Sequence, residues 1–99
     1  MSTEQTSTKT TTTVAYPDRF SVIIFNDDFT PMDFVIQLLI EIFNRNPDEA
    51  KDITLTIHEK GQAIAGTYMH ELAEQKLSEA IMTTRTQGHP LKITMEKMS

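Results

Sequence analysis

The sequence predicts a protein of the α/β (α+β) class, a two-layer sandwich in which a three-stranded antiparallel sheet packs against three helices. The first observation is the run of β-branched and aromatic residues at 20–25, which is typical of a strand. The second is the helical spacing of apolar residues in 34–43 and in 69–87. The third is the alternation of side chains in 91–96, which predicts a last strand. The expected order is therefore β-α-α-β-α-β, and 99 residues leave room for one domain.

The first helix is expected to begin directly after the turn that ends the first strand. Thr30 is the predicted N-cap, Pro31 takes the first helical position, and Asp33 stands where a capping box usually has Glu or Gln. Apolar residues then recur on one helical face, which predicts a helix through about residue 44.

The second helix has clear signals at both ends. Asn46 and Pro47, followed by two acidic residues, indicate its start, and Lys60 with Gly61 indicates its end. The β-branched stretch ITLTI at 53–57 also suits a strand, so both alternatives stay open for this stretch.

The last part of the chain is predicted to add a strand, a helix and a final strand. Residues 63–68 are short and apolar, and Gly66 within them indicates a bulge or a close approach of another group to the backbone. A helix over 69–87 is expected to stop at Gly88, and His89-Pro90 turns the chain into the last strand.

Composition divides the chain into an arm and a core. Residues 2–13 contain seven Thr and two Ser and no apolar side chain, so residues 1–16 are expected to form a disordered arm and 17–99 the folded domain. The net charge of −5 argues against nucleic acid as a partner. No apolar run approaches the ~20 residues of a membrane span. Together with the lack of cysteine, this favours a cytoplasmic protein that has no membrane partner.

Three polar residues, Asn26, Asp27 and Asp28, follow the first strand directly. They either form a turn with a helix cap, or they offer amide and carboxylate oxygens to a cation. Catalysis by paired carboxylates requires two different environments, whereas adjacent aspartates at a strand end are more often turn formers. Calcium is not expected, because residues 29–31 break the spacing of an EF-hand loop.

The three histidines show no metal-binding spacing, and the chain has no cysteine to complete a zinc site, so no metal or other cofactor is expected. His70 and His89 are expected to have structural or surface roles. His58 lies at the end of the apolar face of the second helix, where it either caps the helix or faces a pocket.

The segment NDDFTPMDFV, Asn26 to Val35, closely resembles the N-D-D-x-T-P-M-x-F-V signature of the ClpS adaptor family. Later blocks have counterparts in the same order and at nearly the same spacing: Ile57-His58 with Gly61, Ala63–Gly66, Glu71–Lys76 and His89–Lys97. The resemblance covers about residues 18 to 98.

The resemblance implies an adaptor and not an enzyme. ClpS proteins bind substrate proteins whose first residue is Leu, Phe, Tyr or Trp and hand them to the N-terminal domain of a ClpA- or ClpC-like AAA+ unfoldase with its peptidase. The cation is then the substrate's free α-amino group. The family pattern assigns its binding to Asn26, to one of the aspartates (Asp28 is favoured) and to His58, while Asp27 helps to hold the peptide backbone. A monomer is expected.

The resemblance also implies an apolar pocket for the substrate's first side chain. Met32 matches the family's gate residue, which disfavours β-branched first residues. Thr54 departs from the pattern, because many ClpS sequences carry a methionine there, and this puts the usual order of preference in doubt. The expected lining residues are Thr30, Met32, Val35, Leu38, Thr54, Ile57 and Leu91.

Two surface residues, Glu71 and Lys76, match positions linked to docking on the unfoldase; without the resemblance they would be an ordinary helical ion pair. Two rival functions remain open. One is a non-degradative peptide-binding module of the same fold. The other is a small hydrolase that uses Asp28 and His58, for which no serine is suitably placed.

Overall fold

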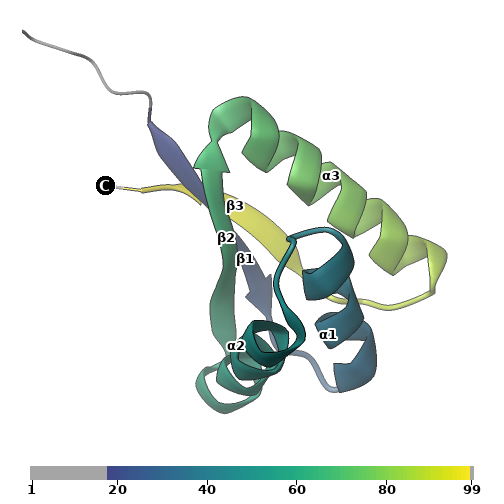
Figure 1. Cartoon of the computed structure of the whole chain (residues 1–99). Coiled ribbons are helices and arrows are strands. Elements are labelled where there is room, and N and C mark those ends of the chain that lie inside the picture. The colour runs from purple at the N-terminus through teal and green to yellow at the C-terminus, as the bar shows by residue number, and fades with distance from the viewer. Residues whose placement is uncertain (1–17, 99) are drawn as a thin grey trace, which may run out of the picture.

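The computed structural model describes residues 18–98. The predicted arm, residues 1–16, and both ends of the predicted 17–99 domain lie outside the described residues. The elements follow the order β-α-α-β-α-β, which confirms the predicted fold class (Figure 1). They are β1 (Arg19–Phe25), α1 (Met32–Glu41), α2 (Pro47–Lys60), β2 (Gln62–Met69), α3 (His70–Thr86) and β3 (Ile93–Lys97).

The sheet has the strand order β2-β1-β3, and β1 is antiparallel to both of its neighbours. In Figure 1, α1 and α3 lie on the same side of the sheet, and α2 lies beside the start of β2. The apolar core between the layers takes Val22 and Ile24 from β1, and both are fully buried. The small residues Ala73 and Ala80 are also fully buried, which lets α3 lie close to the strands.

The prediction for Gly66 is confirmed in both of its forms. The register of β1 with β2 shifts between Val22, which pairs with Gly66, and Ile23, which pairs with Ile64, so β2 carries one extra residue there. The ring of Tyr68 lies against the α-carbon of Gly66, so a Cβ at that position would collide with it. A side chain at position 66 would therefore force the Tyr68 side chain, two residues further along, to move.

The start of α1 differs from the prediction. Thr30 is not the N-cap, because Pro31 occupies that position and no side chain caps the helix. The Thr30 hydroxyl instead donates to Asp27 Oδ2 at 2.7 Å. The helix also ends at Glu41 and not near residue 44, because Asn44 adopts the left-handed conformation with φ of 58°.

The second helix follows its sequence signals closely. The Asn46 side chain accepts from the Glu49 N–H at 2.8 Å, and the Glu49 carboxylate accepts from the Asn46 N–H at 3.1 Å, which completes a capping box. Residues 53–57 are helical, so the strand alternative is wrong. The other boundaries agree to within two residues, and the largest change is that β3 begins at Ile93, which leaves Leu91 in the preceding loop. None of the helices between residues 18 and 98 has the length and hydropathy needed to span a membrane.

Candidate functional site

A backbone connection joins the end of β1 to the end of α2. Gly61 closes α2 with φ of 90°, and its N–H donates to the Ile57 carbonyl at 2.9 Å. The Gly61 carbonyl accepts from the Asn26 N–H, also at 2.9 Å. This connection brings Asn26 and His58 to the wall of one cavity, although they are far apart in the sequence.

The carboxylate of Asp27 is used within the turn that precedes α1. Its Oδ1 accepts from the N–H groups of Phe29 at 2.7 Å and Thr30 at 2.8 Å, and its Oδ2 accepts the Thr30 hydroxyl. Burial raises the pKa of Asp27, but these hydrogen bonds and the neighbouring His89 outweigh it, so the pKa lies below its usual value. The group therefore stays ionised and fixes the turn.

Asp28 is in a different position from its neighbour. Its side chain is exposed and forms no hydrogen bond or ion pair with any residue between 18 and 98. It does not line the cavity, although Asn26 and Asp27 on the same turn do. One aspartate of the pair therefore holds the turn, while the carboxylate of the other remains available beside the mouth.

The cavity has a fixed floor and one exposed apolar wall. Val35, Ile57 and Leu91 are each at most 5% exposed, whereas Met32 at the rim is 43% exposed. The volume is about 20 Å³, which accommodates about one water molecule and no large side chain. An apolar ligand side chain enters only if the wall moves, and flexible Met32 is the wall residue that the core does not hold. The lining residues are Asn26, Asp27, Thr30, Met32, Val35, Thr54, Ile57, His58 and Leu91.

The structure thus brings together most of the residues that the sequence singled out, and two of them do not line the cavity. Asp28 lies on the same turn outside it, as described above. Leu38 is 2% exposed and belongs to the apolar core, so the expectation that it lines the wall is not met.

Thr54 is buried in the wall, with 3% of its surface exposed. Its hydroxyl donates to the Ala50 carbonyl, one turn earlier in α2, at 2.7 Å. The hydrogen of this hydroxyl is therefore already engaged, and only the oxygen lone pairs remain for a ligand. Thr54 is an acceptor in the cavity and not a donor.

Sequence reasoning missed one residue that shapes this site, and it gave a second one only a general structural or surface role. Arg85 donates from Nη1 to the carbonyls of His89 at 3.0 Å and Leu91 at 2.9 Å, so it holds the loop that brings Leu91 into the wall. His89 packs on the Phe34 ring, with 4.5 Å between ring centroids, and its charge acts on Asp27. The position of Arg85 in the last turn of α3 was the available signal for its role in holding the loop, because basic residues at helix ends often bind nearby carbonyls.

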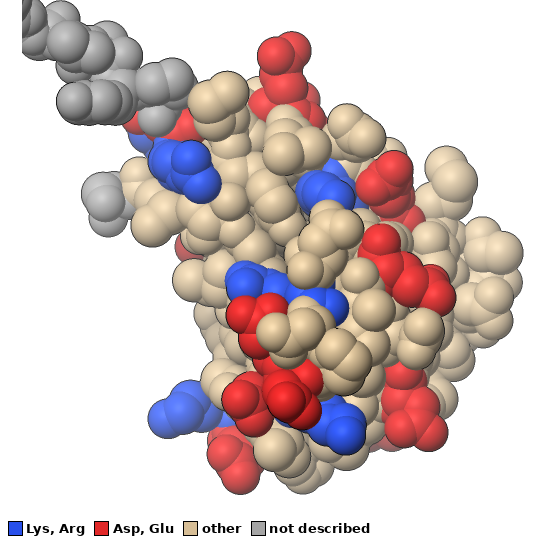
Figure 2. Space-filling view, in the orientation of Figure 1, with Lys and Arg blue, Asp and Glu red and all other residues tan. Residues whose placement is uncertain are grey.

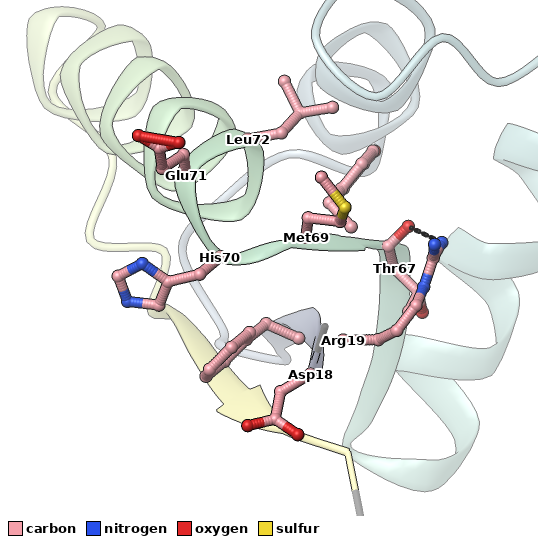
Figure 3. A pocket seen from close by; sticks show the side chains of 9 residues that line it. Asp18, Arg19, Thr67, Met69, His70, Glu71 and Leu72 are labelled. Atoms are coloured by element: carbon pink, nitrogen blue, oxygen red, sulfur yellow. Dashed lines mark hydrogen bonds between the residues drawn. The ribbon is translucent and has the colours of Figure 1, made fainter. Parts of the chain in front are cut away.

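The two candidate docking residues have separate surroundings. Glu71 is exposed in the first turn of α3. It lines a hollow of about 690 Å³ formed by residues 18–20 and 67–72 (Figure 3). In Figure 3, Glu71 and Leu72 project from opposite sides of the start of α3, and a dashed line marks the bond from Arg19 to the Thr67 carbonyl, which measures 3.2 Å.

Lys76 is partly buried, and its ammonium is engaged by the loop after α1. Its Nζ donates to the Ile42 carbonyl at 2.6 Å and to Asn44 Oδ1 at 3.0 Å, so it stabilises the connection between α1 and α2. Among the described residues it forms no ion pair with Glu71, and the alternative of an ordinary helical ion pair is therefore wrong.

The charges on the face shown in Figure 2 indicate no second candidate site. On the face shown in Figure 2, Lys and Arg side chains are scattered among acidic ones and form no continuous basic surface. Within residues 18–98, no three His, Asp or Glu side chains lie close enough to hold a metal ion.

The structure is a small α+β domain in which an amide, an imidazole and a carboxylate line an apolar cavity. The sequence model of the family described as "ATP-dependent Clp protease adaptor protein ClpS" matches residues 15–94. This chain belongs to the ClpS family of Clp protease adaptors.

Relatives and a solved structure agree with this assignment. The ClpS adapter of Desulforapulum autotrophicum is 43% identical over 94 residues, which cover 95% of this chain and 90% of that protein. The ClpS adapter of Nitratidesulfovibrio vulgaris is 45% identical over 85 residues, which cover 86% of this chain and 85% of that protein. Agrobacterium tumefaciens ClpS2, solved with bound L-phenylalaninamide, superposes with a TM-score of 0.80 at 31% identity and covers 84% of this chain and 100% of its own.

Proposed function

We propose that this chain binds the free N-terminal residue of substrate proteins and delivers those proteins to a Clp AAA+ unfoldase and its peptidase. The observation that carries the proposal is the cavity itself, an apolar floor with polar acceptors gathered at its mouth. L-phenylalaninamide, the ligand of the similar ClpS2, combines a free α-amine with an apolar side chain. A ligand with these two features fits the two halves of this site.

The amine half of the site consists of Asn26, His58 and Asp28. An α-ammonium has three donors, and an amide carbonyl, a neutral imidazole nitrogen and a carboxylate each accept one. Asp28 suits this role because its carboxylate has no other partner among the described residues. Asp27 keeps the turn in place and helps to hold the peptide backbone beside the mouth.

The side-chain half of the site takes the first residue of the substrate, which we propose to be Leu, Phe, Tyr or Trp. The side chain lies between Val35, Ile57 and Leu91, and Met32 moves outward to make room for it. Ile and Val are disfavoured because a second branch at Cβ is stiff and crowds the gate. Leu38 supports the floor from the core and does not contact the ligand.

Delivery requires a surface for the unfoldase, which we propose to be the N-terminal domain of a ClpA- or ClpC-like protein. Glu71 suits direct contact, because it is exposed beside a large hollow. Lys76 contributes by shaping the neighbouring loop, since its ammonium already binds Ile42 and Asn44. In this proposal the adaptor acts as a cytoplasmic monomer without a cofactor, and the arm of residues 1–16 is engaged by the unfoldase pore.

Neither hydroxyl in the cavity wall is placed to act as a nucleophile. The two hydroxyls of the cavity wall belong to Thr30 and Thr54, and they donate to Asp27 and to the Ala50 carbonyl. For His58 to act as a general base, a hydroxyl would have to donate its hydrogen to the imidazole, and neither hydroxyl does so. We therefore propose a binding function and not hydrolysis.

A degradation assay tests the adaptor function. A folded reporter that begins with Phe is incubated with a Clp unfoldase and peptidase, with and without this chain, beside a matched reporter that begins with Met. The chain is expected to accelerate degradation of the Phe reporter alone. Binding of the Phe reporter without any acceleration would support the non-degradative peptide-binding module instead.

A further inference from the structure

Met32 differs from the other apolar residues of the cavity wall because much of its side chain faces solvent. Its exposed fraction is 43%, whereas Val35, Ile57 and Leu91 are each at most 5% exposed. It still lines the cavity together with these three residues. One part of the side chain therefore faces the ligand, and another part is accessible to small solutes.

Sulfur chemistry in this chain is confined to methionine, because the sequence has no cysteine. Hydrogen peroxide converts a thioether to a sulfoxide. A sulfur–oxygen bond forms, the O–O bond breaks, the sulfur loses two electrons, and the reduced peroxide leaves as water. The product is polar and chiral, whereas the parent side chain is flexible and apolar.

We propose that Met32 is an oxidative modification site, at which hydrogen peroxide converts the gate to a sulfoxide and weakens binding of apolar N-terminal residues. The inference rests on the proposed function. A sulfoxide oxygen must lose water when an apolar side chain enters, and the wall hydroxyls of Thr30 and Thr54 already donate elsewhere. The ligand-free cavity of about 20 Å³ has room for about one water molecule, so a sulfoxide oxygen that turned inward would compete with a ligand for this space.

Other methionines provide controls inside the same molecule. Met69, Met82 and Met98 are at least as exposed as Met32, with exposed fractions of 53%, 68% and 47%. None of them lines the proposed binding cavity, and Met82 lies in a separate hollow between α3 and β3. Peroxide therefore has access to several methionines of comparable exposure, and of these four only Met32 lines the proposed binding cavity.

The first experiment measures affinity after oxidation. The full chain is treated with graded hydrogen peroxide, sulfoxide is located by peptide mapping, and a labelled Phe-initiated peptide is titrated by fluorescence anisotropy. Affinity is expected to fall about tenfold when Met32 is fully oxidised, and at partial oxidation the loss should follow the fraction of sulfoxide at Met32. Met82→Leu should remain equally sensitive, whereas Met32→Leu should keep its own starting affinity after treatment. Unchanged affinity with Met32 oxidised, or an equal loss in Met32→Leu, overturns the inference.

The second experiment measures protection in the unmodified protein. A saturating Phe-initiated peptide is expected to slow sulfoxide formation at Met32 and to leave the rate at Met82 unchanged. Equal rates at Met32 with and without peptide overturn the inference. If the untreated protein does not bind the peptide, the proposed function is overturned and this inference with it, whereas binding that oxidation leaves unaffected overturns this inference alone.

Discussion

Replacing Thr54 by methionine should change which first residues bind best. Thr54 is 3% exposed in the cavity wall and is shorter than a methionine. A methionine adds apolar contact worth about one buried methylene, ~0.8 kcal/mol, to a short ligand such as Leu. Leu-initiated peptides should therefore bind about fourfold more tightly. Phe, Tyr and Trp reach deeper, so the added side chain should crowd them.

The hydroxyl of Thr54 gives a second and separable effect. It donates to the Ala50 carbonyl at 2.7 Å, so it can only accept from a Tyr hydroxyl or a Trp indole N–H. Thr54→Val keeps the shape and removes the acceptor. This matched variant should weaken Tyr and Trp relative to Phe by about 1 kcal/mol, or about fivefold. The ratio of Phe to Leu affinity should not change.

Anisotropy titrations of Leu-, Phe-, Tyr- and Trp-initiated peptides against the parent and both variants provide the test. The predicted pattern is a lower ratio of aromatic to Leu affinity in Thr54→Met, and a loss confined to Tyr and Trp in Thr54→Val. If Thr54→Met leaves the aromatic-to-Leu ratio unchanged, residue 54 does not contact the ligand and the reasoning is refuted.

Three further substitutions test the gate, the turn and the loop. Met32→Ala should admit Val- and Ile-initiated peptides, which the parent excludes, and peptide titration would show this. Asp27→Asn should lower the melting temperature at pH 7. The difference between the two proteins should disappear progressively as pH falls below about 4, because the pKa of this carboxyl is lowered in the folded protein and its stabilisation is lost on protonation. A difference in melting temperature that stays constant across pH would contradict this. Lys76→Met should destabilise the fold by about 1–2 kcal/mol in urea because its bond to the Ile42 carbonyl is lost, whereas Lys51→Met at an exposed position should change little.

The parts of the fold with local signals were predictable from the sequence. The capping box at Asn46 and the glycine end of α2 at Gly61 depend on residues a few positions apart, and both are present. The bulge and the close approach at Gly66 were predictable, because a glycine within a strand usually marks one of these two features. The cap at Thr30 was wrong because two local options competed, and the charged carboxylate of Asp27 took the Thr30 hydroxyl as a donor.

The site residues were predictable where the family signature specifies them. They were less predictable where side-chain packing determines whether a residue lines the cavity. Helical spacing places Val35 and Leu38 on one face, but it does not show that one lines the cavity while the other lies within the core. The bond from Lys76 to the Ile42 carbonyl was not expected, because the two residues are 34 positions apart in the sequence. Long-range contacts of this kind leave no pattern in a single sequence.

The central claim is that the site recognises a free N-terminal residue through its α-amine. The most direct test compares the affinity of one Phe-initiated peptide with that of its acetylated form by fluorescence anisotropy. Acetylation removes the charge and two donors, and a hydrogen bond to a charged group contributes about 1.5–3 kcal/mol, so the acetylated peptide should bind at least tenfold more weakly. Asn26→Ala and His58→Ala should reduce this difference, because both residues lie at the cavity mouth. Equal affinity for the free and acetylated peptides would contradict the account.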